Sequence, residues 1–160
     1  MNKVNIYIYT TIKSPRKRQG AYTYILEAAT SKGDATRSAT EQLENVTAHR
    51  VELIALAAAI KRICKHCELT IYTDSVYLPS CVEKWLDKWQ QDDWVNAKGQ
   101  PVANMEEWKD LACLLNEHSY RFVVGEKHSY YEWLKAESER AEKNVCSRKH
   151  NRLSENARTY

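Results

Sequence analysis

Hydrophobic and polar residues alternate with a period of two along the first part of the chain, which is typical of β-strands. The pattern is clearest over residues 4–10, where β-branched and tyrosine side chains predominate. It returns over 21–28 and, more weakly, over 36–46, and turn-forming residues separate the three segments. The sequence therefore predicts a meander of three antiparallel strands.

After this meander the hydrophobic period changes to that of a helix. Thr47 is a typical helix N-cap residue, and apolar residues follow at helical spacing as far as Ile60. A short apolar strand over 68–73 then ends in Asp74. The remaining pattern predicts a helix over 76–91, a polar loop over 92–104, a helix over 105–117, a strand over 121–124 and a charged helix over 130–143.

This order of elements predicts an α/β fold. Three strands, a helix and a buried strand favour a mixed sheet that is antiparallel at one side and parallel at the other. Neither an internal repeat nor a linker is visible. We expect one domain over 1–145 and a polar, flexible tail over 146–160.

Composition narrows the class of protein. A chain of 160 residues with 43% hydrophobic and 28% charged residues is typical of one globular domain. The longest apolar run, 53–60, is too short to cross a bilayer, and no signal peptide is visible, so we expect a cytoplasmic monomer without a membrane partner. The net charge of +3 permits nucleic-acid binding without requiring it.

The chain contains five cysteines, and an odd number without a secretion signal favours reduced thiols. Cys64 and Cys67 form a lone CxxC motif. A structural zinc site would need a second pair at similar spacing, and none follows. We interpret the motif as part of a helix-to-strand turn.

Three residues with catalytic chemistry stand at the ends of predicted elements. Glu52 lies one turn into the first helix, Asp74 ends the fourth strand and His128 follows the fifth. In a mixed α/β sheet these ends form the crevice where ligands bind. Converging carboxylates repel one another unless they hold a cation, and paired divalent ions promote phosphodiester hydrolysis. Each residue alone also fits a structural interpretation, as a solvated glutamate, a helix cap or a surface histidine.

Several motifs in register resemble those of bacterial type 1 ribonuclease H. The matching segments are TAHRVEL (47–53), IYTDS (71–75), WLDKWQQDDW (85–94), Pro101-Val102, 104–108 and 120–128. They resemble that family's first helix, its fourth-strand motif, its protruding helix and loop, and its catalytic-histidine loop. The resemblance implies a ribonuclease H-like fold with a five-stranded mixed sheet, strand order 3-2-1-4-5, and helices on both faces.

The resemblance also implies cleavage of the RNA strand of an RNA–DNA hybrid with Mg²⁺ or Mn²⁺. In that family four acidic residues bind two ions and a histidine assists. Glu52 and Asp74 match two of the catalytic, metal-binding carboxylates, and His128 matches the histidine. Thr11 and Ser138 stand where the family has its other two aspartates. We therefore expect weak or single-ion binding, or none, with cleavage lost or weakened.

Neighbouring residues leave room for compensation. Glu137 or Glu139 could replace Ser138 if the last helix shifts by one residue. The family's glycine-rich hairpin is replaced here by SPRKRQ (14–19), so this turn and Lys13 add positive charge near the site.

The resemblance places nucleic-acid contacts at Thr47, His49 and Arg50, at the start of the first helix. Two asparagines of the family are Ala48 and His49 here, which alters the expected minor-groove contacts. Three tryptophans of the protruding region remain, but we interpret them as packing residues, because the stretch between the last two is acidic. These tryptophans are Trp85, Trp89 and Trp94.

Three hypotheses follow. The first is a catalytically impaired family member that still binds hybrid or duplex nucleic acid. The second is a structural or interaction module that no longer binds nucleic acid. The third is a working nuclease with an unusual ligand set. Glu52, Asp74 and His128 favour the first and third, whereas Thr11 and Ser138 disfavour the third.

Overall fold

The computed structural model describes residues 2–143. The predicted tail over 146–160 lies outside the described residues, as do the last residues of the predicted domain. Within the described part of the chain, no helix is both long and apolar enough to cross a membrane.

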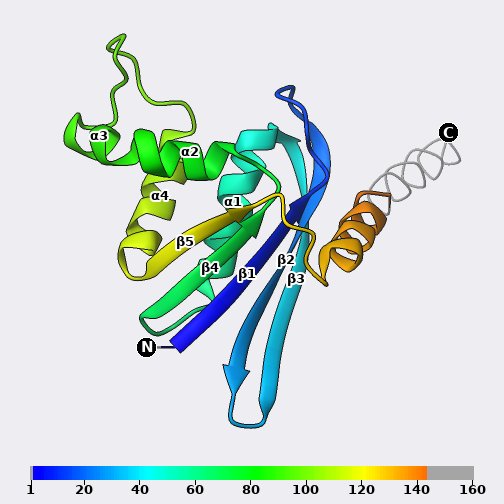
Figure 1. Cartoon of the computed structure of the whole chain (residues 1–160). Helices are drawn as coiled ribbons and strands as arrows, with labels where there is room; N and C mark the ends of the chain where they lie inside the picture. The colour runs from blue at the N-terminus through cyan, green and yellow to red at the C-terminus, as the bar shows by residue number, and fades with distance from the viewer. Residues whose placement is uncertain (1, 144–160) are drawn as a thin grey trace, which may run out of the picture.

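Five strands form one mixed sheet (Figure 1). Strand β2 pairs antiparallel with both β1 and β3, and β4 pairs in parallel with both β1 and β5. The order β3-β2-β1-β4-β5 confirms the predicted strand order. The strands are β1 (Asn2–Thr10), β2 (Arg18–Thr30), β3 (Gly33–Val46), β4 (Cys67–Thr73) and β5 (Ser119–Val124).

Helices cover both faces of this sheet, as predicted. On one face, α1 (Ala48–Lys61) and α4 (Met105–Asn116) enclose the main core with the inward side chains of β1, β2 and β4. On the other face lies a helix over 131–143, drawn in orange in Figure 1. It contributes to a smaller buried cluster of Tyr7, Tyr9, Ile25 and Leu134.

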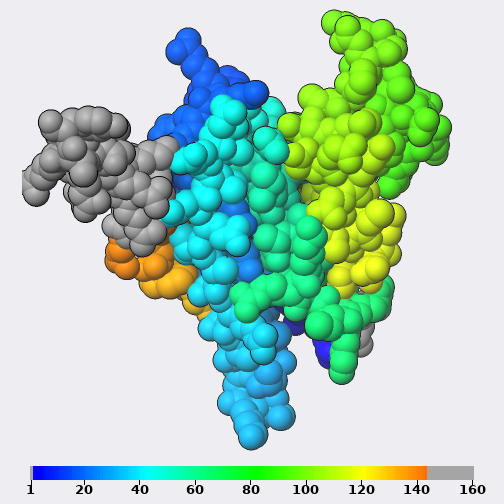
Figure 2. Space-filling model, turned by 180° about the vertical axis from the view of Figure 1, so that it is seen from behind, coloured from blue at the N-terminus to red at the C-terminus, as the bar shows by residue number. Residues whose placement is uncertain are grey.

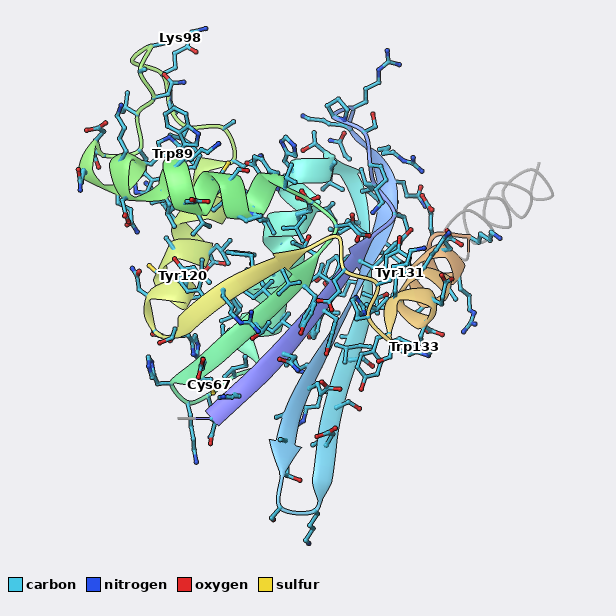
Figure 3. All side chains as sticks on the ribbon, viewed as in Figure 1. Cys67, Trp89, Lys98, Tyr120, Tyr131 and Trp133 are labelled. Carbon is cyan, nitrogen blue, oxygen red and sulfur yellow. The ribbon has the colours of Figure 1, made fainter. Side chains whose placement is uncertain are left out.

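The predicted helix over 76–91 is wrong as one continuous helix. It is divided into α2 (Tyr77–Lys84) and α3 (Leu86–Gln91), because Trp85 leaves the helical conformation at φ −125°. The chain then projects away from the sheet in a loop closed by a bridge between Val95 and Pro101. Figure 3 shows Lys98 at the far end of this loop.

The tryptophans of this projecting region differ in their surroundings. The ring of Trp89 contacts those of Trp94 and Trp108, with centroids 6.5 and 5.6 Å apart. Trp94 is buried, whereas Trp85 is 46% exposed. The packing interpretation is therefore confirmed for Trp89 and Trp94, and Trp85 lies open to solvent.

The turn after β1 is held tightly against β2. The backbone N–H of Thr11 donates to the carbonyl of Ala21, and its Oγ1 accepts from the Ala21 N–H. Ile12 is fully buried, and it packs so closely on Gly20 that a Cβ there would lie 2.4 Å from Ile12 Cγ1. A glycine is needed at position 20 for this approach, and the approach fixes the backbone that leads into Lys13.

Candidate active site

A cavity of about 310 Å³ opens where β1 and β4 end beside the first turns of α1. The side chains around it include Glu52 from α1, Asp74 from the end of β4, and Lys13 from the turn after β1. His49 lines the same cavity. The structure thus brings together the two carboxylates that the sequence singles out. Lys13 lines the same cavity.

Glu52 is the least well satisfied polar group of the site. Its Oε2 atom is buried and has no hydrogen-bond partner among the described residues. Burial raises the pKa of Glu52 from 4.5 to about 7, although a hydrogen bond with Ser75 and the charge of Lys13 act in the opposite direction. A buried carboxylate in this position favours either a proton or a nearby cation.

Asp74 faces the last helix as well as the cavity. Burial and the negative charge of Asp74 raise the pKa of Tyr131, and a hydrogen bond joins the two side chains. Figure 3 shows Tyr131 on the helix over 131–143, close to the end of β1. Asp74 therefore connects the cavity to the opposite layer of the fold.

His128 lies in a tyrosine cluster and is not among the described residues that line the cavity. Its ring centroid is 4.5 Å from that of Tyr7 and 5.7 Å from that of Tyr72. Its Nδ1 accepts a hydrogen bond of 3.2 Å from the backbone N–H of Tyr130. Burial lowers the pKa of His128, against the charges of Asp74 and Glu126, and this favours the neutral ring.

Thr11 and Ser138 both bond to β2. Ser138 is fully buried, and its hydroxyl donates a 2.7 Å hydrogen bond to Thr23 Oγ1. Thr11 bonds to Ala21 through its backbone and its hydroxyl. Neither is among the described residues that line the cavity.

The glutamates on either side of Ser138 have different neighbours. Glu137 forms an ion pair with Arg140, in which Arg140 Nη1 lies 2.8 Å from Glu137 Oε1. Glu139 lies close enough to Tyr9 for its charge to raise the pKa of that phenol, after the larger effects of burial and Tyr131. Glu137 is therefore engaged along its own helix, whereas Glu139 lies nearer the first strand.

Lys13 is the site residue that sequence reasoning did not place. The sequence predicted positive charge nearby, but it did not put this ammonium in the cavity. The Nζ atom of Lys13 lies 4.4 Å from the centroid of the Tyr9 ring, in a cation–π contact. Lys13 is exposed as a residue, but loss of hydration beside the cavity lowers the pKa of its ammonium, while the charges of Asp74 and Glu52 act to raise it. No local sequence signal marked Lys13, because the burial of Ile12 that fixes the next residue depends on the close approach of Gly20 on β2.

These residues do not fit a two-ion metal centre. Such a centre needs several converging oxygen ligands with enough negative charge for two dications. The described residues contain no group of three or more histidine, cysteine, aspartate or glutamate side chains that could hold a metal ion. The cavity offers two carboxylates, and the positively charged Lys13 lines it with them. We therefore derive no metal-dependent step for this site.

The residues expected to contact nucleic acid stand at one edge of the molecule. Thr47 Oγ1 caps α1 by accepting from the backbone N–H of Arg50. The His49 ring stacks on Tyr77 with centroids 3.7 Å apart. Arg50 donates through Nε to Glu107 on α4 at 2.6 Å, so its charge is partly engaged within the protein.

Two projections border this edge. In Figure 2 the basic turn after β1, in blue, and the α2–α3 region, in green, rise on either side of the start of α1, in cyan, with a notch between them. The turn is tied to the helix start, because Ala48 N–H donates to the Ser14 carbonyl at 3.1 Å. Arg16 and Lys17 are exposed on this turn.

The two CxxC cysteines have different surroundings. Cys67 is buried at the start of β4, as Figure 3 shows, whereas Cys64 is exposed, and both are free thiols. Cys81 and Cys113 are also free. The interpretation as a helix-to-strand turn is confirmed, since the motif joins α1 to β4.

Comparisons with known proteins identify the family and the fold. A family model described as RNase H matches residues 2–146. Ribonuclease H of Clostridium botulinum is 30% identical over 136 residues, which cover 83% of this chain and 89% of that protein.

Solved structures show the same fold at lower identity. LC9-RNase H1, described as a type 1 RNase H with the type 2 active-site motif, has a TM-score of 0.73 at 18% identity, covering 90% of this chain and 74% of that one. A foamy viral protease-reverse transcriptase in complex with RNA/DNA hybrid has a TM-score of 0.63 at 17% identity. That match covers 88% of this chain and 20% of the viral one.

Proposed function

The chain belongs to the ribonuclease H family, and on that premise we propose that it binds RNA–DNA hybrid or duplex nucleic acid with little or no cleavage. One observation carries this proposal: the cavity lined by Glu52 and Asp74 is also lined by the positively charged Lys13. The metal-dependent endonuclease activity of the family needs more negative charge than this cavity supplies.

Loss or weakening of cleavage follows from the ligand chemistry. In this proposal Glu52 and Asp74 are the remaining metal-binding and catalytic carboxylates, and Thr11 and Ser138 replace the other two. A hydroxyl is a poor ligand for a hard dication and adds no charge. Mg²⁺ or Mn²⁺ would then bind weakly, as a single ion or not at all. His128 would keep the family's assisting role, since a neutral ring beside Asp74 can accept a proton.

Nucleic-acid binding is supported by the charge and shape of the same edge. The start of α1, capped by Thr47, presents backbone N–H groups that suit a phosphate. Arg16 and Lys17 are exposed beside it, on a turn bonded to α1. His49 and Arg50 complete the proposed contact surface. One solved relative by fold is described in complex with RNA/DNA hybrid, which makes that ligand the first to test.

The alternative is a structural or interaction module on the same fold. Two arginines that could contact phosphate are engaged within the protein instead. Arg50 pairs with Glu107, and Arg18 pairs with Glu142 on the helix over 131–143 at 2.7 Å. In either role we propose a cytoplasmic protein, which the free thiols support. The monomeric state stays a prediction.

Fluorescence polarisation with labelled RNA–DNA hybrid, duplex DNA and duplex RNA separates these two functions. We expect micromolar affinity, on the order of 10⁻⁶ M at about 50 mM salt, with a shallow salt dependence because few phosphates are contacted. Lys17→Glu should weaken binding about fivefold, since it reverses one charge at the proposed contact edge.

Lys32→Glu is the matched control for this measurement. Lys32 is exposed in the β2–β3 turn at the opposite end of the molecule, and its reversal changes the net charge equally. It should leave the affinity within about twofold. If the two variants weaken binding equally, the proposed edge is wrong, and if none of the three duplexes binds, the interaction module is the better account.

A further inference from the structure

We propose that the ammonium of Lys13 is a built-in counter-cation for Glu52 and Asp74 and takes the place of divalent ions in this cavity. As a consequence, the cavity accepts a nucleic-acid phosphate without metal, and this second part rests on the proposed function. The three side chains line one cavity, although they come from three separate elements of the fold.

The backbone before Lys13 is anchored on both sides. Thr11 bonds twice to Ala21 on β2, and the side chain of Ile12 is fully buried. Gly20 permits β2 to approach this turn, because any Cβ there would overlap Ile12. On the far side of Lys13, the Ser14 carbonyl accepts from Ala48 N–H at the start of α1. Lys13 is therefore held between two fixed points, facing the site.

The lysine side chain is also held at its charged end. Its Nζ atom lies over the Tyr9 ring, 4.4 Å from the centroid, and Tyr9 is itself buried. A ring face attracts an ammonium and limits its freedom to extend into solvent. The charges of Asp74 and Glu52 act on Lys13 from the opposite wall, and Lys135 acts on it from the last helix.

Charge balance explains what this arrangement achieves. Two carboxylates without a cation would repel a phosphate, and the family solves this problem with metal ions. Here one ammonium offsets one carboxylate, and Lys135 adds a second positive charge close enough to Lys13 to act on it. A phosphate can then approach without a dication. A dication, in contrast, must displace Lys13 or bear its repulsion, so metal binding is weakened in the wild-type protein.

Calorimetric titration with Mn²⁺ alone tests the counter-cation directly, on the full chain and without nucleic acid. We expect Lys13→Gln to bind Mn²⁺ at least about tenfold more tightly than the wild-type protein, because the carboxylate pair loses its counter-charge. Lys32→Gln is the matched control, since it removes the same charge from an exposed position in the β2–β3 turn, at the opposite end of the molecule. It should bind Mn²⁺ as the wild-type protein does.

Equal Mn²⁺ affinities for the wild-type protein and Lys13→Gln would overturn the counter-cation. Circular dichroism checks that the variant is folded, and Lys13→Met, which keeps an unbranched apolar side chain without the charge, replaces it if it is not. Hybrid binding measured in EDTA and in Mg²⁺ then tests the phosphate. We expect equal affinity in both buffers for the wild-type protein and about a fivefold loss in EDTA for Lys13→Gln.

The Mn²⁺ titration and the hybrid-binding measurement test the counter-cation and the proposed function independently. Tighter Mn²⁺ binding by Lys13→Gln together with no hybrid binding in any buffer supports the counter-cation and contradicts the proposed function. Hybrid binding by the wild-type protein that requires Mg²⁺ supports nucleic-acid binding and overturns the metal-free phosphate site.

Discussion

Ser138→Asp is expected to lower the free energy of unfolding by about 3–5 kcal/mol in metal-free buffer, the range for an uncompensated buried charge. Ser138 belongs to the helix over 131–143 and is fully buried where that helix meets β2, with its hydroxyl donating to Thr23. A carboxylate there loses its hydration and meets a threonine hydroxyl instead of a cation. Urea unfolding followed by circular dichroism measures the change.

Ser138→Ala is the matched control, because it removes the same hydrogen bond without adding charge. We expect it to lower the free energy of unfolding by about 1 kcal/mol. If Ser138→Asp is no more destabilising than Ser138→Ala, position 138 is not buried as the structure shows it.

The same position also tests the matching to the family. If Thr11 and Ser138 stand for the family's two missing aspartates, the double variant Thr11→Asp with Ser138→Asp should regain stability when Mn²⁺ is added, and should bind that ion more tightly than the wild-type protein. Binding to the folded state alone raises the free energy of unfolding. No gain in Mn²⁺ affinity would count against the residue matching.

Glu52→Gln is expected to stabilise the protein by about 2 kcal/mol at about pH 8 and to have little effect at about pH 4.5. Burial raises the pKa of Glu52 to about 7 in the folded state, against 4.5 when unfolded. The wild-type protein is therefore fully stable below the unfolded pKa and loses this contribution as the pH rises from 4.5 through 7. Glutamine does not ionise, so the variant avoids that loss.

Urea unfolding of both proteins across this pH range measures the effect. Glu83→Gln, at an exposed position of α2, is the control and should follow the pH dependence of the wild-type protein. Equal stability of Glu52→Gln and the wild-type protein at every pH would show that the Glu52 carboxylate is solvated. If Glu52→Gln stabilises the protein, Glu52 lowers stability in the wild-type protein, which is typical of a residue that serves function.

Most of the fold could be predicted because its signals are local. Alternation predicted the three-stranded meander, and the helical spacing after Thr47 predicted α1. The ends of β2 and β3 extend beyond the predicted segments, because backbone pairing continues where their side chains are polar and exposed. The break at Trp85 has no local signal, since tryptophan and its neighbours are compatible with a helix.

The site was predicted in part, and for a physical reason. Glu52 and Asp74 stand at element ends, where topology brings side chains together. His128 owes its position to Tyr7 and Tyr72, which are distant in the sequence. Lys13 owes its position to the burial of Ile12, which depends on the close approach of Gly20 on β2. Such contacts depend on the whole packed sheet and leave no periodic signal in the chain.

Cleavage of an RNA–DNA hybrid is the measurement that tests the central claim most directly. The purified protein is incubated with Mg²⁺ or Mn²⁺ and a hybrid labelled on the RNA strand, under conditions in which the hybrid is bound. We expect the wild-type protein to cleave no more RNA than the Asp74→Asn variant does. Efficient cleavage that Asp74→Asn abolishes would contradict the account, and would show that Glu52 and Asp74 form part of a working catalytic site.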